Sequence, residues 1–66
     1  MVFRVGQMVN SLRIGAQKEF VGEVTQFVEK DHPSESFYVV RDSQGRSWYR
    51  ERHELAPING TAEVVR

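Results

Sequence analysis

The residues best suited to metal binding or proton transfer do not form a cluster in this sequence. The two histidines, His32 and His53, fall in different expected loops, and no His-x-x-His pair or carboxylate cluster accompanies them. Cysteine is absent, which excludes disulfides, thiolate ligands and cysteine nucleophiles. The sequence therefore predicts neither a metal site nor a bound cofactor.

The serine and carboxylate residues also do not form the arrangements that catalysis requires. The Ser/His/Asp residues within 31–36 are neighbours in sequence, but they lack the strand, sharp turn and helix that expose a catalytic serine. Glu51 and Glu54 are spaced as a carboxylate pair, but arginines lie among them, which favours solvated ion pairs over acid/base work. The sequence predicts no catalytic residue, so a non-catalytic protein is the expectation.

Aromatic and β-branched residues in two expected strands are more informative, because they fall on both faces of the sheet. Side chains alternate between faces along a strand, so neighbours in sequence point in opposite directions. A small β-barrel has one interior, and one of the two sets must remain outside. The two sets are Phe37, Val39 and Tyr49 on one face, and Tyr38, Val40 and Trp48 on the other.

We expect Trp48 to be buried, because its spacing from Leu55 and Ile58 fits a strand, a turn and a closing strand that share one core. The opposite set then forms an exposed patch, and exposed apolar patches mark interaction sites. Aromatic residues rimmed by arginine are typical of interfaces. The reverse register, and cover of the patch by residues 59–66 or by the loop around Lys18, are the alternatives. The expected partner-binding residues are Phe37, Val39, Tyr49, Arg41, Arg46 and Arg50.

Protein binding is the function that this pattern favours, either as self-association or as docking on a larger protein. A 66-residue chain without disulfides has little stability in reserve, and association supplies more. The alternative is a single-stranded nucleic-acid binder that stacks bases on the same aromatic and arginine residues. The formal net charge is zero, whereas a dedicated DNA-binding module usually has a basic excess.

Membrane insertion and secretion are not expected. No apolar run is long enough for a transmembrane helix, and the first residues are too short an apolar run for a secretory signal. A chain without cysteine fits a cytoplasmic location.

The elements that must position the patch are short strands, since ten valines, seven aromatic residues and only two leucines favour β-structure. Residues 43–45 predict a tight hairpin turn with Gly45 at positive φ. Gly22 within a strand predicts a bend or a close backbone approach, on a face shared by Phe20, Val24 and Val28. The expected strands are 7–14, 20–30, 36–42, 46–50 and 55–58, with one helical turn at 51–53.

This order of elements resembles an SH3-like barrel over about residues 5–58. The resemblance implies an all-β fold: an SH3-like five-stranded small barrel over 1–58, with one short helical turn before the last strand and a polar tail over 59–66. It implies no single function, because one fold supports many functions. The segments that carry it are Gly6-Gln7-Met8-Val9, Phe20-Val21-Gly22-Glu23-Val24, Phe37-Tyr38-Val39-Val40, Gly45-Arg46-Ser47-Trp48-Tyr49 and Glu54-Leu55-Ala56-Pro57-Ile58.

A weaker resemblance connects the chain to the type II plasmid dihydrofolate reductases, SH3-like barrels that assemble as tetramers around a central pore. It rests on Gly6-x-x-Val9, Val21-Gly22-Glu23-Val24 and Leu55-x-x-Ile58-Asn59. That family lines its pore with Val-Gln-Ile-Tyr, and the corresponding place here is Ser47-Trp48-Tyr49-Arg50. Only a tyrosine recurs, and a tryptophan would crowd a shared pore, so this enzyme activity is the least favoured of the three functions.

Overall fold

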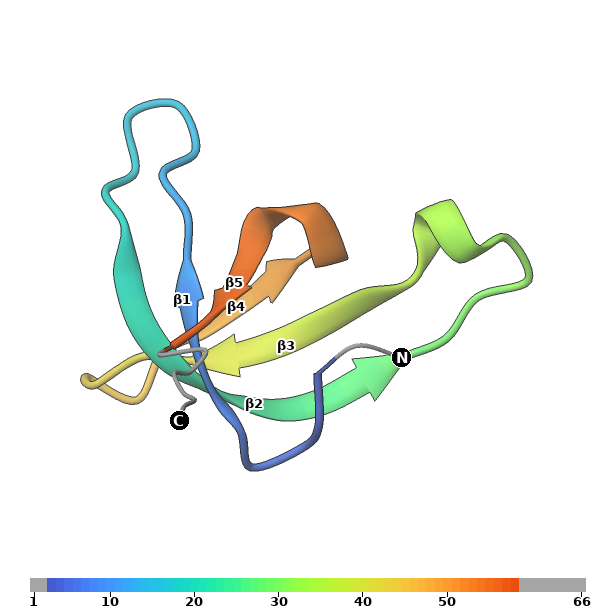
Figure 1. The fold of residues 1–66 in the computed structure, drawn as a ribbon, viewed down its shortest axis with the longest axis horizontal. Helices are drawn as coiled ribbons and strands as arrows, with labels where there is room; N and C mark the ends of the chain where they lie inside the picture. The colour runs from blue at the N-terminus through green and yellow to red at the C-terminus, as the bar shows by residue number, and fades with distance from the viewer. Residues whose placement is uncertain (1–2, 59–66) are drawn as a thin grey trace, which may run out of the picture.

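The structure, a computed structural model, describes residues 3–58 and contains one sheet of five antiparallel strands. The strand order is β4-β3-β2-β1-β5, and the backbone ladder of the described residues ends at β4 and β5 without pairing these two strands. The elements are β1 (Met8–Ser11), β2 (Phe20–Val28), β3 (Phe37–Arg41), β4 (Ser47–Arg50), β5 (Leu55–Pro57) and two 3-10 turns, η1 (Pro33–Glu35) and η2 (Arg52–Glu54) (Figure 1).

The expected all-β chain of five strands, with one helical turn before the last strand, is confirmed. The second helical turn, η1, was not expected. It begins at Pro33, whose fixed φ suits the first position of a helical turn, and the backbone N–H of Ser36 donates to the Pro33 carbonyl to close it. The expected polar tail, 59–66, lies outside the described residues.

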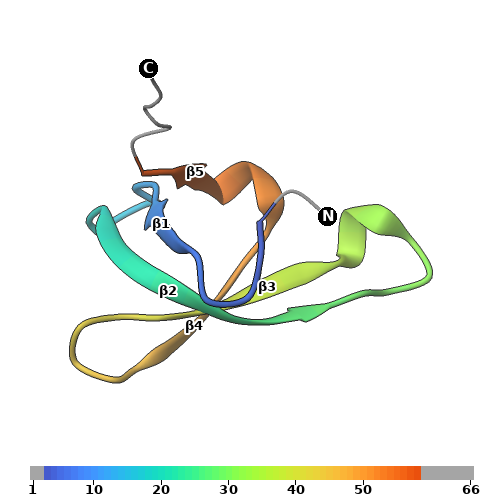
Figure 2. The same cartoon turned by 60° about the horizontal axis from the view of Figure 1, so that its bottom comes forward.

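The longest strand, β2, gives the sheet its curvature, and in Figures 1 and 2 it bends so that the sheet curls around one interior. Gly22 lies in this strand opposite Val9 of β1. A Cβ atom at Gly22 would stand 2.6 Å from Cγ1 of Val40 and 2.7 Å from the backbone oxygen of Arg41. The predicted close backbone approach is therefore confirmed, and only glycine fits this position without a local shift.

The interior is built from side chains of β1, β2, β3, β5 and the segment before β1. The buried hydrophobic residues are Phe3, Val9, Val24, Tyr38, Val40 and Leu55, with Phe20 and Phe27 packed against them. Tyr38 and Val40 thus face inward, and the expectation that their set occupies the interior is confirmed for these two residues.

Trp48 is only half-buried, whereas the sequence predicts that it is buried. Its place opposite Val40 puts it on the inner face as expected. However, β4 is an edge strand, and at this end of the sheet the aromatic neighbour of Trp48 is Phe20, with ring centroids 5.7 Å apart. The indole therefore covers the margin of the core instead of filling its centre.

Phe3 is a core residue that the strand pattern did not predict, because it precedes β1 and belongs to no alternating segment. Its side chain is 3% exposed, and its ring meets the Tyr38 ring edge-on with centroids 5.4 Å apart. The backbone N–H of Phe3 also donates to the Tyr38 hydroxyl, at 3.4 Å. The segment before β1 thereby covers one side of the core.

We expect the substitution Gly22→Ala to destabilise the fold by about 1–3 kcal/mol, because the new methyl group overlaps a side chain and a backbone carbonyl. Urea denaturation measures the change. The matched control is Val21→Ala, one residue away on the exposed face, for which a change within about 0.5 kcal/mol is expected. Equal stability of Gly22→Ala and the wild-type protein would contradict the close approach.

Candidate functional site

The outer face of β3 and β4 brings together the three apolar residues that the alternation placed there. Val39 lies opposite Tyr49 in the register, and the rings of Phe37 and Tyr49 contact each other with centroids 5.1 Å apart at 34°. Tyr49 is 68% exposed, whereas Phe37 and Val39 are half-buried. The β1–β2 loop that holds Lys18 leaves Tyr49 exposed.

Val28 joins this group, although the strand pattern assigned it to the inner face with Phe20 and Val24. The register shifts between Val24 and Gln26, where a β-bulge at Thr25 inserts one extra residue into β2. The bulge exchanges the faces of all later residues, so Phe27 lies opposite Tyr38 inside and Val28 lies opposite Phe37 outside. We call the resulting cluster of Val28, Phe37, Val39 and Tyr49 the outer patch.

The two arginines of the β3–β4 hairpin near this patch are engaged by neighbouring residues. Arg41 lies opposite Glu23 in the register and forms an ion pair with it, at 3.3 Å. Arg46 donates to the side-chain oxygen of Gln44 and lies 3.8 Å from the Asp42 carboxylate. The border of the outer patch therefore carries paired charges of both signs.

Arg50 lies on the other face of the sheet and does not flank the outer patch as expected. It shares the parity of Trp48, faces Tyr38 in the register, and is only 8% exposed. The position of Arg50 could be predicted from the sequence, because side chains alternate along a strand and residues 48 and 50 must therefore share a face. The expected group of six partner-binding residues is therefore divided between the two faces.

The Arg50 guanidinium connects β4 to parts of the chain that are distant in sequence. Its Nε donates to the hydroxyl of Ser11 in β1, at 2.9 Å, and its Nη2 donates to the side-chain oxygen of Gln17 in the β1–β2 loop. Its Nη1 donates to the carbonyl of Tyr49, at 2.8 Å. All three acceptors are neutral, and no carboxylate of residues 3–58 lies within ion-pair distance of this cation.

Two aromatic rings complete the surroundings of Arg50. The central carbon of the guanidinium lies 5.3 Å from the Trp48 ring centroid and 5.7 Å from that of Phe20, within the range of cation–π attraction. A buried arginine is thus surrounded by two rings and neutral oxygen atoms.

Asp42 organises the β3–β4 turn and orients Trp48. One carboxylate oxygen accepts the backbone N–H groups of Gln44 and Arg46, and the other accepts the indole N–H of Trp48, all at 2.9 Å. Gly45 has φ of +85°, so the predicted hairpin turn is confirmed. The hydrogen bond from Trp48, followed by those from the turn, lowers the pKa of Asp42 below its ordinary value of 3.8 despite partial desolvation.

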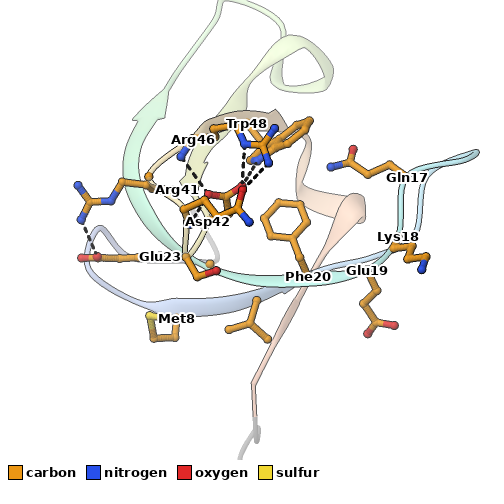
Figure 3. A pocket seen from close by; sticks show the side chains of 15 residues that line it. Met8, Gln17, Lys18, Glu19, Phe20, Glu23, Arg41, Asp42, Arg46 and Trp48 are labelled. Atoms are coloured by element: carbon orange, nitrogen blue, oxygen red, sulfur yellow. Dashed lines mark hydrogen bonds and ion pairs between the residues drawn. The ribbon is translucent and has the colours of Figure 1, made fainter.

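A hollow of about 1070 Å³ opens between the β1–β2 loop and the β3–β4 turn. Figure 3 shows the rings of Phe20 and Trp48 and the amide of Gln17 pointing toward one another, whereas Met8 and Glu19 point to the opposite side of β2. The feature extends to the other side of β2, where Met8, Glu19 and Glu23 also line it. We call its part on the inner side of β2 the inner hollow, defined by Gln17, Lys18, Phe20, Asp42, Arg46 and Trp48.

Metal-ligand clusters and membrane-spanning helices are both absent from the part of the chain that the structure describes. Within residues 3–58, no three side chains of the His, Cys, Asp or Glu type gather to hold a metal ion. None of the helices in this range is long and apolar enough to cross a bilayer.

No family model, curated protein or solved structure matches this chain. The resemblances to SH3-like barrels and to type II dihydrofolate reductases therefore stay predictions, and the argument for function rests on the two surfaces described above.

We expect Arg50→Lys to lower the free energy of unfolding by about 1.5–3 kcal/mol, because a lysine keeps the charge but cannot reach three separated acceptors with one planar fork. Chemical denaturation at constant pH and salt measures the loss. The matched control is Arg41→Lys, which alters an exposed ion pair and should cost less than about 1 kcal/mol. Equal costs for the two variants would contradict the anchoring role of Arg50.

The lowered pKa of Asp42 predicts a specific acid sensitivity. Because the folded-state pKa lies below the unfolded one, the ionised carboxylate stabilises the fold above about pH 4, and this contribution is lost as the pH falls through the lower folded-state value. We expect Asp42→Asn to be less stable at neutral pH and to lose less stability on acidification than the wild-type protein. Thermal melts at a series of pH values test this, with the exposed residue Asp31→Asn as control; parallel pH profiles for Asp42→Asn and wild type would contradict the prediction.

Proposed function

We propose that this chain is a small interaction module that binds another protein chain through the outer patch, with a second copy of itself as the first candidate partner. The observation that carries the proposal is the contacting pair of Phe37 and Tyr49 rings on a face where Tyr49 is 68% exposed. Tyrosine is common among the residues that dominate interface energetics, because it offers a large rigid apolar ring with a polar end.

The composition of the outer patch supports a protein partner. Val28 and Val39 flank the two rings, so the four side chains form one continuous apolar surface across β2, β3 and β4. Burying an aromatic or branched side chain contributes about 1.5–3 kcal/mol, and a partner that covers the patch gains this contribution several times. The patch is also preorganised, since all of its residues lie on paired strands.

A second copy is the partner that the charges fit best. The formal net charge of zero leaves little long-range repulsion between copies. A two-fold contact places the same surface on both partners, and the Arg41–Glu23 pair beside the patch offers each copy both signs of charge. Tyr49 lies on β4, an edge of the sheet, where a second molecule can approach without displacing another strand.

Nucleic acid is less well supported as the partner of this face. Base stacking on Phe37 and Tyr49 requires nearby cations for the phosphates. Arg50 lies on the inner face, and Arg41 is paired with Glu23. Two of the arginines expected beside the rings, Arg41 and Arg50, are therefore not free to bind phosphates at the outer patch.

The experiment that tests the proposal is Tyr49→Glu, compared with Tyr49→Phe. We expect the wild-type protein to sediment as an oligomer that dissociates on dilution, with a melting temperature that rises with protein concentration. Tyr49→Glu places a charge in the contact and should give a folded monomer, whereas Tyr49→Phe retains the ring and should still associate. Trp48 fluorescence reports whether each variant keeps its fold.

Two results together would overturn self-association. They are a strict monomer at millimolar protein concentration, and a stability of Tyr49→Glu within about 0.5 kcal/mol of the wild-type value.

A further inference from the structure

The inner hollow combines two features that the outer patch lacks: ring faces beside a buried cation, and, within residues 3–58, no carboxylate at ion-pair distance from that cation. Phe20 and Trp48 are both half-buried, and their planes are inclined by 47° with centroids 5.7 Å apart. The hydrogen bond from the indole N–H to Asp42 holds the Trp48 ring in place. Figure 3 shows both rings on the side of β2 toward which Gln17 points. The hollow therefore contains a preformed stacking surface for a planar ring.

The cation is Arg50, which is more than nine-tenths buried. Burial of a charge is costly unless an opposite charge or a full set of hydrogen bonds compensates it. A guanidinium has five N–H donors, and the acceptors of Arg50 in the described chain are the neutral oxygens of Ser11, Gln17 and Tyr49. No carboxylate of the described part of the chain lies within ion-pair distance of this guanidinium.

Gln17 is the residue through which an anion can reach Arg50. Its side chain lines the hollow, and its amide oxygen accepts a hydrogen bond from Nη2 of Arg50. A ligand oxygen that replaces this amide oxygen gains a charge-assisted hydrogen bond in place of a weaker neutral one. Gln17 lies in the loop between β1 and β2, so its side chain can turn away from Arg50 without a change in the sheet.

The carboxylates that line the hollow each have a hydrogen-bond or ion-pair partner, and none of them lies within ion-pair distance of Arg50. Glu19 points to the opposite side of β2 and accepts a hydrogen bond from Asn10. Glu23 is paired with Arg41, and both oxygens of Asp42 accept hydrogen bonds. Lys18 also lines the hollow, and its ammonium has no ion-pair partner within residues 3–58.

We propose that the inner hollow binds a nucleotide, whose base stacks on Phe20 and Trp48 and whose anionic group displaces Gln17 from Arg50. The same chemistry occurs in a free nucleotide and at a position of a single-stranded nucleic acid. This site is separate from the outer patch and does not depend on self-association.

Trp48 is the only tryptophan of the chain, so quenching of its fluorescence reports binding directly. The probes are AMP, adenosine and a short single-stranded oligoadenylate. We expect AMP to bind at least about tenfold more tightly than adenosine, because only AMP brings a charge to Arg50. If the oligonucleotide binds more tightly than AMP, with a steep salt dependence, the ligand of the hollow is a single-stranded nucleic acid. If the oligonucleotide binds equally or more weakly, the ligand is a free nucleotide.

The variant Gln17→Glu separates binding from folding, because it supplies an internal carboxylate to Arg50. We expect this variant to melt at a higher temperature than the wild-type protein and to bind AMP at least about tenfold more weakly. The matched control, Gln17→Ala, removes the amide without adding a charge and should bind AMP as tightly as the wild-type protein or more tightly.

Three results would each overturn the proposal. They are no quenching by any probe at millimolar concentration, equal affinity for adenosine and AMP, and wild-type affinity for AMP in Gln17→Glu. None of these results bears on self-association through the outer patch.

Discussion

The Arg50 guanidinium is the link on which the arrangement at one end of the sheet depends. The backbone ladder runs from β4 to β5 and does not join β4 to β1 among the described residues. Arg50 supplies that connection with its side chain, since it donates to Ser11 in β1 and to Gln17 in the following loop. The rings of Phe20 and Trp48 lie beside this link.

Two features of β2, the glycine at position 22 and the bulge at Thr25, determine how the sheet bends and which side chains face inward. Gly22 lets the backbone of β2 approach β3 more closely than any residue with a Cβ atom permits. The bulge at Thr25 then exchanges the two faces of the strand and increases its local twist. As a result Phe27 joins Tyr38 in the core, with ring centroids 4.7 Å apart, while Val28 reaches the opposite face.

The two faces consequently differ in chemistry. The outer patch is apolar and aromatic, and the charges beside it are paired. The inner hollow has rings of similar type beside Arg50, which has no carboxylate within ion-pair distance among residues 3–58. The two faces of one small sheet therefore present an apolar aromatic cluster on one side and two rings beside a buried arginine on the other.

Local geometry determined a large part of this structure. The alternation of side chains along a strand is a property of the extended backbone, so the sequence alone separates Phe37 from Tyr38 and Trp48 from Tyr49. The register that pairs Val39 with Tyr49 comes from the structure. The turn at Gly45 and the close approach at Gly22 follow from the absence of a Cβ atom, which is also a local property. The composition, rich in valine and aromatic residues, sufficed for an all-β fold of short strands.

Only the tertiary structure decided where the charges and the margin of the core lie. The bulge that moves Val28 outward depends on how β2 pairs with β3. In the sequence its sign is Gln26, which interrupts the apolar face of β2 next to the register shift. Phe3 becomes a core residue because the curled sheet leaves room beside Tyr38. The partners of Arg50 lie 39 and 33 positions away in sequence, at Ser11 and Gln17. Alternation specifies the direction of a side chain within its own strand, whereas its contacts depend on which distant segments the curvature of the sheet brings opposite it.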